Sequence, residues 1–214
     1  MEGEASGTLA STAYAESIGY TWYLSDTLSA AIGQSYNNFT PIQMARYVSM
    51  LANGGKNIDV SIVKSIINPD GTEVSKEEID KFVKEKLDTE NEVKEDIEIS
   101  KENLDAIKKG MRGVTSEAGG TAYSTFADFD MDIAGKTGSA QVIMPDGKEE
   151  AHGWFVGFAP YDKPEIAVVV LVEKASSGGY TASVAKAIME EYFGMNAEEV
   201  TEDKNAQSGV ESVR

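Results

Sequence analysis

The residues best suited to chemistry lie together in one short stretch, Gly-Lys-Thr-Gly-Ser. Lys136 offers an ammonium group, Thr137 and Ser139 offer hydroxyls, and the backbone adds N–H donors, so the stretch could bind an anionic or carbonyl group. Gly135 and Gly138 remove side chains on either side of the Lys-Thr pair and would let a ligand approach the backbone closely. Because these residues are common, Lys-Thr-Gly alone is equally well explained as part of an ordinary strand.

The composition excludes several classes of function. The chain has 214 residues, of which 41% are apolar, which is enough for a packed core. A formal net charge of -17 argues against nucleic-acid binding, which needs a basic surface. Without cysteine and with one histidine, His152, the chain can form neither a disulfide nor a multi-histidine metal centre. The longest apolar run, 166–172, is far shorter than the ~20 residues of a membrane helix and predicts a buried strand.

The order of the expected elements predicts an α+β fold. Helices are expected at about 41–53, 101–112 and 181–193, and turn signals between apolar runs predict an antiparallel meander of three strands over 131–172. No hydrophobic period emerges in residues 1–30, which we expect to be irregular and packed on another segment.

The best-defined helix begins at Thr40-Pro41-Ile42-Gln43. Threonine can cap the helix, proline suits its first position, and glutamine completes a capping box. Asn53-Gly54-Gly55 then predicts its end. Met44, Val48 and Leu51 recur with helical spacing and form one apolar face.

A charged insertion follows this helix. A strand is expected over 60–67, followed by a turn at Pro69-Asp70-Gly71. Residues 73–100 interleave Lys and Glu, and Ser75 with Glu78 can cap a short helix there. Such a pattern predicts a solvated face or insertion, with an acidic docking site for a partner as the alternative.

Six stretches together resemble, in order, the C-terminal half of the transpeptidase domain of class B penicillin-binding proteins. The resemblance covers about residues 28–193, so we expect residues 1–194 to be the C-terminal portion of such a domain and 195–214 to be a polar, disordered tail. The matching stretches are Ala31-Ile32-Gly33-Gln34, Thr40-Pro41-Ile42-Gln43-Met44-Ala45, Ala52-Asn53-Gly54-Gly55, Gly119-Gly120-Thr121-Ala122, Gly135-Lys136-Thr137-Gly138-Ser139-Ala140-Gln141 and Trp154-Phe155-Val156-Gly157-Phe158-Ala159-Pro160.

The resemblance implies a D,D-transpeptidase that cross-links peptidoglycan stem peptides through a serine acyl-enzyme, without a cofactor or metal. It implies a site at the outer face of a bacterial cell membrane, with an anchor upstream, and acylation by β-lactams. Lys136 would supply positive charge, and Thr137, Gly138 and Ser139 would line the substrate-binding wall. The hydroxyls of Thr137 and Ser139 would bind the substrate carboxylate, and the Ser139 backbone N–H would form half of an oxyanion hole.

The nucleophilic serine is expected outside this chain. Ser61-Ile62-Val63-Lys64 matches Ser-x-x-Lys, but it lies in a strand-like run, where positions i and i+3 point to opposite faces. Ser183-Val184-Ala185-Lys186 also matches but falls in the C-terminal helix, behind the sheet in this family. Ser35-Tyr36-Asn37 matches the Ser-x-Asn motif, but it lies downstream of that motif's place in the family.

We therefore expect a truncated domain that is inactive alone. Missing segments of the same domain would leave the face of Met44, Val48 and Leu51 exposed, which predicts self-association of the isolated chain. Two alternatives stay open: a non-catalytic β-lactam sensor domain and, less well supported by the motifs, a serine β-lactamase-like hydrolase.

Other polar and aromatic residues have simpler explanations. His152 begins a strand next to Lys136, and we expect a structural role rather than base catalysis. Trp154 and Phe155 are expected to pack in the core and the cleft wall. The alternating aspartates have spacing that a metal site could use but are expected to be solvated; they are Asp128, Asp130 and Asp132.

Overall fold

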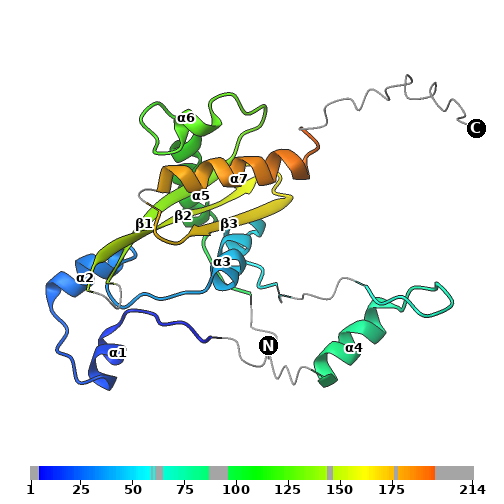
Figure 1. Cartoon of the computed structure of the whole chain (residues 1–214), viewed down its shortest axis with the longest axis horizontal. Coiled ribbons are helices and arrows are strands. Elements are labelled where there is room, and N and C mark those ends of the chain that lie inside the picture. Colours follow the sequence, from blue (N-terminus) through cyan, green and yellow to red (C-terminus); the bar gives the residue numbers. More distant parts are fainter. Residues whose placement is uncertain are drawn as a thin grey trace, which may run out of the picture.

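The computed structural model describes residues 5–58, 60, 65–86, 96–143, 147–175 and 178–195. Within these ranges, helices precede a sheet and one helix follows it, so the predicted α+β class is confirmed (Figure 1). The elements are α1 Thr12–Ser17, α2 Leu24–Ala31, α3 Pro41–Asn53, α4 Lys76–Lys86, α5 Lys101–Ser116, α6 Tyr123–Phe126, β1 Ala134–Ile143, β2 Glu149–Ala159, β3 Ile166–Val172 and α7 Gly178–Tyr192. Some expectations lie outside the described residues: residues 61–64 of the strand 60–67, the segment 87–95 of the charged insertion and the tail from 196.

The sheet is the antiparallel meander that the sequence predicts. Its order is β1-β2-β3, with Lys136 opposite Val156 and Phe155 opposite Val170. Gly135 lies opposite Gly157, and an added Cβ at either position would collide with the Phe155 ring, so this glycine pair makes room for that ring.

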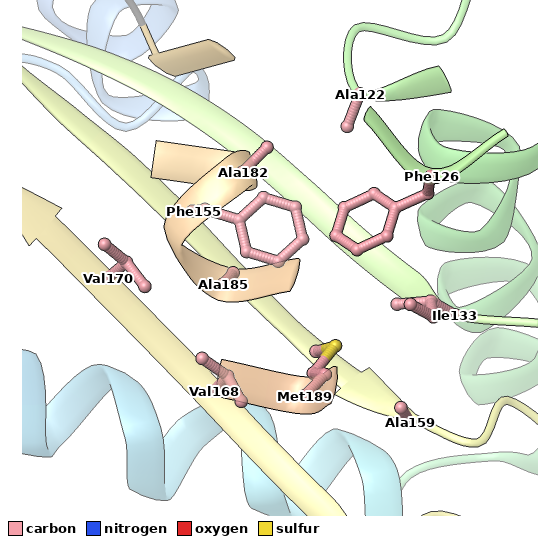
Figure 2. Close-up of a cluster of buried hydrophobic side chains, with 10 residues drawn as sticks. All are labelled: Ala122, Phe126, Ile133, Phe155, Ala159, Val168, Val170, Ala182, Ala185 and Met189. Carbon is pink, nitrogen blue, oxygen red and sulfur yellow. The ribbon is translucent and has the colours of Figure 1, made fainter. Parts of the chain in front are cut away.

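One face of the sheet is covered by α7, which crosses it in Figure 1. The fully buried ring of Phe155 lies 5.6 Å from that of Phe126, measured between centroids. Figure 2 shows the two rings side by side, with small side chains of α7 and valines of β3 around them. This cluster contains Ala122, Phe126, Ile133, Phe155, Ala159, Val168, Val170, Ala182, Ala185 and Met189.

The opposite face is covered by α3 and α5. Val48 is completely buried and Leu51 nearly so, and both pack with Met111 of α5 and Phe158 of β2. The expectation that the face of Met44, Val48 and Leu51 is exposed is therefore wrong, because the sheet itself covers this face of α3. Large apolar side chains are exposed elsewhere, above all on and just after α2, where they form a stripe of Leu24, Leu28 and Ile32.

The start and end of α3 are those predicted. The Thr40 hydroxyl accepts from the Gln43 N–H at 3.3 Å, and the Gln43 side chain accepts from the Thr40 N–H at 2.9 Å. Pro41 occupies the first helical position, and Gly54 ends the helix in the left-handed conformation, with φ of 88°. The capping box satisfies two backbone donors that the first turn leaves without helical partners.

The helix α5 begins at Lys101, as expected, with the Ser100 side chain as its cap, but it continues four residues beyond the predicted end at 112. Gly110 and Gly113 lie near the predicted end of this helix, and each lowers helix propensity by about 1 kcal/mol without forcing the helix to stop. Packing outweighs that cost here, because the buried Thr115 hydroxyl lies 2.5 Å from the carbonyl oxygen of Ile133, next to the start of β1.

Residues 1–30 are more regular than expected where they are described. Two short helices occur, and each begins with a local cap: the Ser11 hydroxyl accepts from Tyr14 N–H, and the Asp26 carboxylate accepts from Tyr23 N–H. Of the residues in α1 and α2, Ala15 alone is buried. The helical spacing of Leu24 and Leu28 in α2 was present in the sequence but was not recognised there.

The described part of the charged insertion forms the expected turn and helix. Gly71 N–H donates to Asn68 oxygen across the turn, and Ser75 and Glu78 cap α4 through reciprocal hydrogen bonds. In Figure 1, α4 stands apart from the sheet. In the portion of the chain that the structure describes, every helix is too short or too polar to cross a bilayer.

Candidate active site

The candidate site lies on β1, an edge strand of the described sheet. Residues in an antiparallel pair either exchange both backbone hydrogen bonds with the partner strand or direct both groups away from it. The Ser139 carbonyl oxygen accepts from Gln34 Nε2 at 3.2 Å, outside the sheet. We infer that both backbone groups of Ser139 face away from β2. Thr137 lies two residues before Ser139, so its backbone groups should face the same way. Its carbonyl oxygen accepts from the Lys136 ammonium, outside the sheet, which fits this alternation.

The side chains of the Lys-Thr-Gly-Ser stretch remain accessible. Lys136 and Ser139 are exposed, while Thr137 and Gly138 are half-buried. The structure therefore places the predicted donors on one accessible edge: an ammonium, two hydroxyls and outward backbone groups. Such an edge suits an anionic ligand with an extended polar chain.

Thr121 belongs to this edge. Its hydroxyl lies 2.6 Å from the Thr137 hydroxyl, so the loop 119–121 reaches the site as well as turning the chain. The sequence motif Gly119-Gly120-Thr121 identified the loop but did not show which strand residue it contacts. The motif that contains Gln34 was also noted in the sequence, but its contact with Ser139, far along the chain, was not predicted.

The two glycines of the motif differ in their surroundings. A Cβ added at Gly135 would lie 2.5 Å from Phe155 Cζ, so this glycine makes room for a core ring rather than for a ligand. A Cβ added at Gly138 would lie 3.3 Å from Trp154 Cβ, a closer contact than most real side chains make but one open to small adjustment.

The surroundings of Trp154, Phe155 and His152 agree with the packing and structural roles expected for them. Phe155 is core, whereas Trp154 is half-buried on β2. His152 Nδ1 accepts from the Lys174 N–H at 3.1 Å, which connects β2 to the chain just after β3 and fits the expected structural role.

In two of the alternative nucleophile motifs, a polar side chain has partners within the chain. Lys186 is committed to ion pairs with Asp128, at 2.6 Å, and with Glu190, at 3.8 Å. Asn37 binds the chain locally, since its amide donates to the carbonyl oxygens of Ala30 and Gln34. The match at 61–64 lies outside the described residues.

The alternating aspartates are separated rather than clustered. Asp128 pairs with Lys186, and the hydrogen bond from that ammonium holds the pKa of Asp128 below its ordinary value. Asp132 pairs with Arg112 at 2.6 Å. Among the described residues there is no group of three or more acidic or histidine side chains that could hold a metal ion.

Two hollows in the described residues are lined by side chains other than those of the Lys-Thr-Gly-Ser stretch. One, of about 260 Å³, is lined by residues of α5, α6 and the segment before β1, including Phe126 and Ile133. The other, of about 470 Å³, is a shallow groove along β3 beside Ile42 and Ile188. In the described part of the chain, the candidate site is thus an open strand edge outside these two hollows.

Residues 3–191 match the family model described as "Penicillin binding protein transpeptidase domain". The chain belongs to this family. The comparisons support the class B assignment, which the sequence motifs had indicated.

Two curated relatives of this penicillin-binding protein domain illustrate the similarity. The chain is 31% identical over 191 residues to peptidoglycan D,D-transpeptidase MrdA of Haemophilus influenzae, covering 84% of the chain and 27% of that relative. It is 36% identical over 151 residues to penicillin-binding protein H of Bacillus subtilis, covering 68% of the chain and 20% of that relative. The chain thus spans about a quarter of the length of these relatives.

A solved structure supports the fold assignment. The structure of Pseudomonas aeruginosa PBP2 in complex with WCK 5153 matches with a TM-score of 0.68 and 32% identity, over 94% of this chain and 40% of that one. The transpeptidase-like α+β fold of the present chain is therefore shared with a penicillin-binding protein.

Proposed function

We propose that this chain forms the Lys-Thr-Gly wall of a peptidoglycan D,D-transpeptidase whose nucleophilic serine is contributed by residues outside the chain. The observation that carries the proposal is the placement of Lys136, Thr137 and Ser139 on one accessible strand edge. The similarity to the transpeptidase MrdA supports this reaction rather than β-lactam sensing or hydrolysis.

In the proposed reaction, a serine hydroxyl attacks the carbonyl between two D-alanines, the peptide bond breaks, and the terminal D-alanine leaves. An amine of a neighbouring stem peptide then attacks the resulting ester and regenerates the serine. The leaving residue carries a carboxylate, which needs a cationic or hydroxyl-lined site for binding.

Lys136 supplies the local attraction for that carboxylate. The chain as a whole has a formal charge of -17 and would repel an anion at long range. A single ammonium about 4 Å from a carboxylate is worth about 1 kcal/mol in water and about 4 kcal/mol at a partly screened protein surface. Closure of the cleft by the rest of the domain would exclude water and move the interaction toward the larger value.

Ser139 supplies the second contribution through its backbone. Because its C=O bonds Gln34 outside the sheet, its N–H is inferred to point outward as well. An N–H in that position can donate to the oxygen that becomes negative when the serine attacks. Loss of one such donor in other acyl-transfer enzymes costs about 2.7–4 kcal/mol of transition-state stabilisation.

The exposed stripe of Leu24, Leu28 and Ile32 suits a surface on which another protein segment packs. These side chains are 77%, 65% and 79% exposed and follow a helical spacing of four residues. We propose that the remaining part of the transpeptidase domain packs here in the whole protein, at the outer face of a bacterial membrane. Without that cover, the isolated chain is expected to self-associate through this stripe and to be inactive.

Labelling with a fluorescent penicillin tests the function. The full-length protein should form a stable covalent adduct, whereas the isolated chain should form none. In the full-length protein, Lys136→Ala should slow acylation at least tenfold, while Lys163→Ala, at an exposed lysine in the turn between β2 and β3, should not. An adduct on the isolated chain, or equal rates for the two variants, would refute the proposed role of this wall. Labelling without release of D-alanine from a stem-peptide substrate would favour the sensor alternative.

A further inference from the structure

We propose that Thr121 is a positioning residue for Thr137. Its hydroxyl donates a hydrogen bond to the Thr137 hydroxyl and so directs the Thr137 hydrogen toward the substrate carboxylate. The inference rests on the proposed function, and the observation behind it is the 2.6 Å separation of the two hydroxyl oxygens.

The loop that carries Thr121 is held tightly against the end of α5. Gly120 N–H donates to the Glu117 oxygen at 2.8 Å, and Ala122 N–H donates to the Val114 oxygen at 3.0 Å. Gly120 itself contacts the last turn so closely that an added Cβ would collide with the Val114 carbonyl oxygen. The two backbone bonds flank Thr121 and set its position.

The same end of α5 is tied to the strand that carries Thr137. The Thr115 hydroxyl, 3% exposed as a residue, lies 2.5 Å from the Ile133 oxygen, one residue before β1 begins. The loop of Thr121 and the start of the strand that carries Thr137 are therefore both tied to the end of α5, and this holds the two hydroxyls near one another although their contact lies at the surface.

The chemistry of the pair gives the contact a direction. A threonine hydroxyl has one hydrogen to donate and two lone pairs to accept with. If Thr137 donates its hydrogen to a carboxylate, it must accept from Thr121. The hydrogen bond from Thr121 then polarises the Thr137 hydroxyl and strengthens its bond to the anion. Thr121 thus acts through Thr137 rather than on the substrate directly.

The prediction concerns the second-order rate constant for acylation of the full-length protein by a fluorescent penicillin. Thr121→Val removes the donor at almost constant volume and should lower this rate constant about three- to tenfold, as expected for one net hydrogen bond. Thr121→Ser keeps the hydroxyl and should stay within about twofold of the wild-type protein. Thr125→Val, on the neighbouring α6, is the matched control and should have no effect.

A double-mutant cycle separates positioning from general structural support. Thr137→Val alone should slow acylation, and adding Thr121→Val to it should cause no further loss, because Thr121 acts through the group already removed. An unchanged rate for Thr121→Val, or an equal additional loss in the Thr137→Val background, would overturn the inference while leaving the proposed function intact. A wild-type full-length protein that forms no adduct would overturn the proposed function, and this inference with it.

Discussion

Gln34 and Ser139 are joined by a hydrogen bond, at 3.2 Å, from the side-chain amide of the first to the carbonyl oxygen of the second. The contact spans 105 positions of the chain and ties the loop after α2 to the strand that carries Lys136. It occupies a backbone acceptor on an edge strand, where acceptors otherwise depend on solvent or a ligand. Gln34 therefore both anchors the N-terminal segment and defines the far end of the candidate site.

Removal of this donor should weaken the fold slightly. Gln34→Ala and the similarly sized Gln34→Glu both lose the amide N–H, and each should lower the free energy of unfolding of this chain by about 0.5–1.5 kcal/mol. Urea unfolding followed by tryptophan fluorescence measures the change. Gln141→Ala, at an exposed glutamine on the same strand, is the control and should change stability less. Wild-type stability in both Gln34 variants would show that the contact contributes nothing.

The two glycines of the motif should respond differently to the same substitution. Gly135→Ala places a methyl group 2.5 Å from Phe155 Cζ and 3.2 Å from Thr115 Cγ2, so it should destabilise the chain by about 1–3 kcal/mol through overpacking. Gly138→Ala meets one atom at 3.3 Å and should cost less. Thermal unfolding should show the larger fall in Tm for Gly135→Ala.

A compensating change identifies the cause. Phe155→Leu removes the ring atoms that the methyl group meets, so Gly135→Ala should cost less stability when added to Phe155→Leu than when added to the wild type. Equal destabilisation by the two glycine variants, with no smaller cost of Gly135→Ala in the Phe155→Leu background, would contradict the assignment of Gly135 to core packing.

The sequence predicted those parts of the fold that depend on neighbouring residues. The cap of α3 follows from Thr40, Pro41 and Gln43, which lie within four positions and interact with one another. The meander was predictable because apolar runs and turn signals alternate over a short span. The family motifs pointed to Lys136 and Thr137 as candidate site residues because six such stretches occur in the family's order.

What the sequence did not predict depends on contacts between distant segments. α2 was missed because it is only eight residues long, so the spacing of Leu24 and Leu28 gave a single repeat of the helical period. The predicted exposure of Val48 was wrong because nothing in the sequence of the helix shows that the sheet covers it. The contacts of Gln34 with Ser139 and of Thr121 with Thr137 required the folded arrangement of loops around β1.

The capping box of α3 should contribute measurably to stability. Thr40→Ala removes the acceptor for the Gln43 N–H and should lower the free energy of unfolding by about 1 kcal/mol, or about 2–4 °C in Tm for a domain of this size. Thr40→Ser keeps the acceptor and should retain most of the stability. Thermal unfolding of the three proteins makes the comparison, and a Thr40→Ala protein as stable as the wild type would be inconsistent with a working cap.

Acid should remove the contribution of the ion pair between Asp128 and Lys186. The hydrogen bond from Lys186 lowers the pKa of Asp128 from its ordinary value of 3.8, so the folded state favours the charged carboxylate. For a lowered pKa, the contribution to stability is fully present well above the unfolded value. It is lost as the pH falls through the lower folded value, because the carboxyl is then protonated in both states.

Asp128→Asn should therefore be less stable than the wild type at pH 7, and the difference should shrink below about pH 4. The pair bridges the segment after α6 to α7, with Lys186 19% exposed and Asp128 78% exposed, so solvent screening keeps the effect small. Urea unfolding at pH 7, 5 and 3.5 measures the difference at each pH, and Asp130→Asn, at a neighbouring exposed carboxylate, serves as the control. A stability difference for Asp128→Asn that stays constant from pH 7 to pH 3.5 would show that the substitution acts through packing rather than charge.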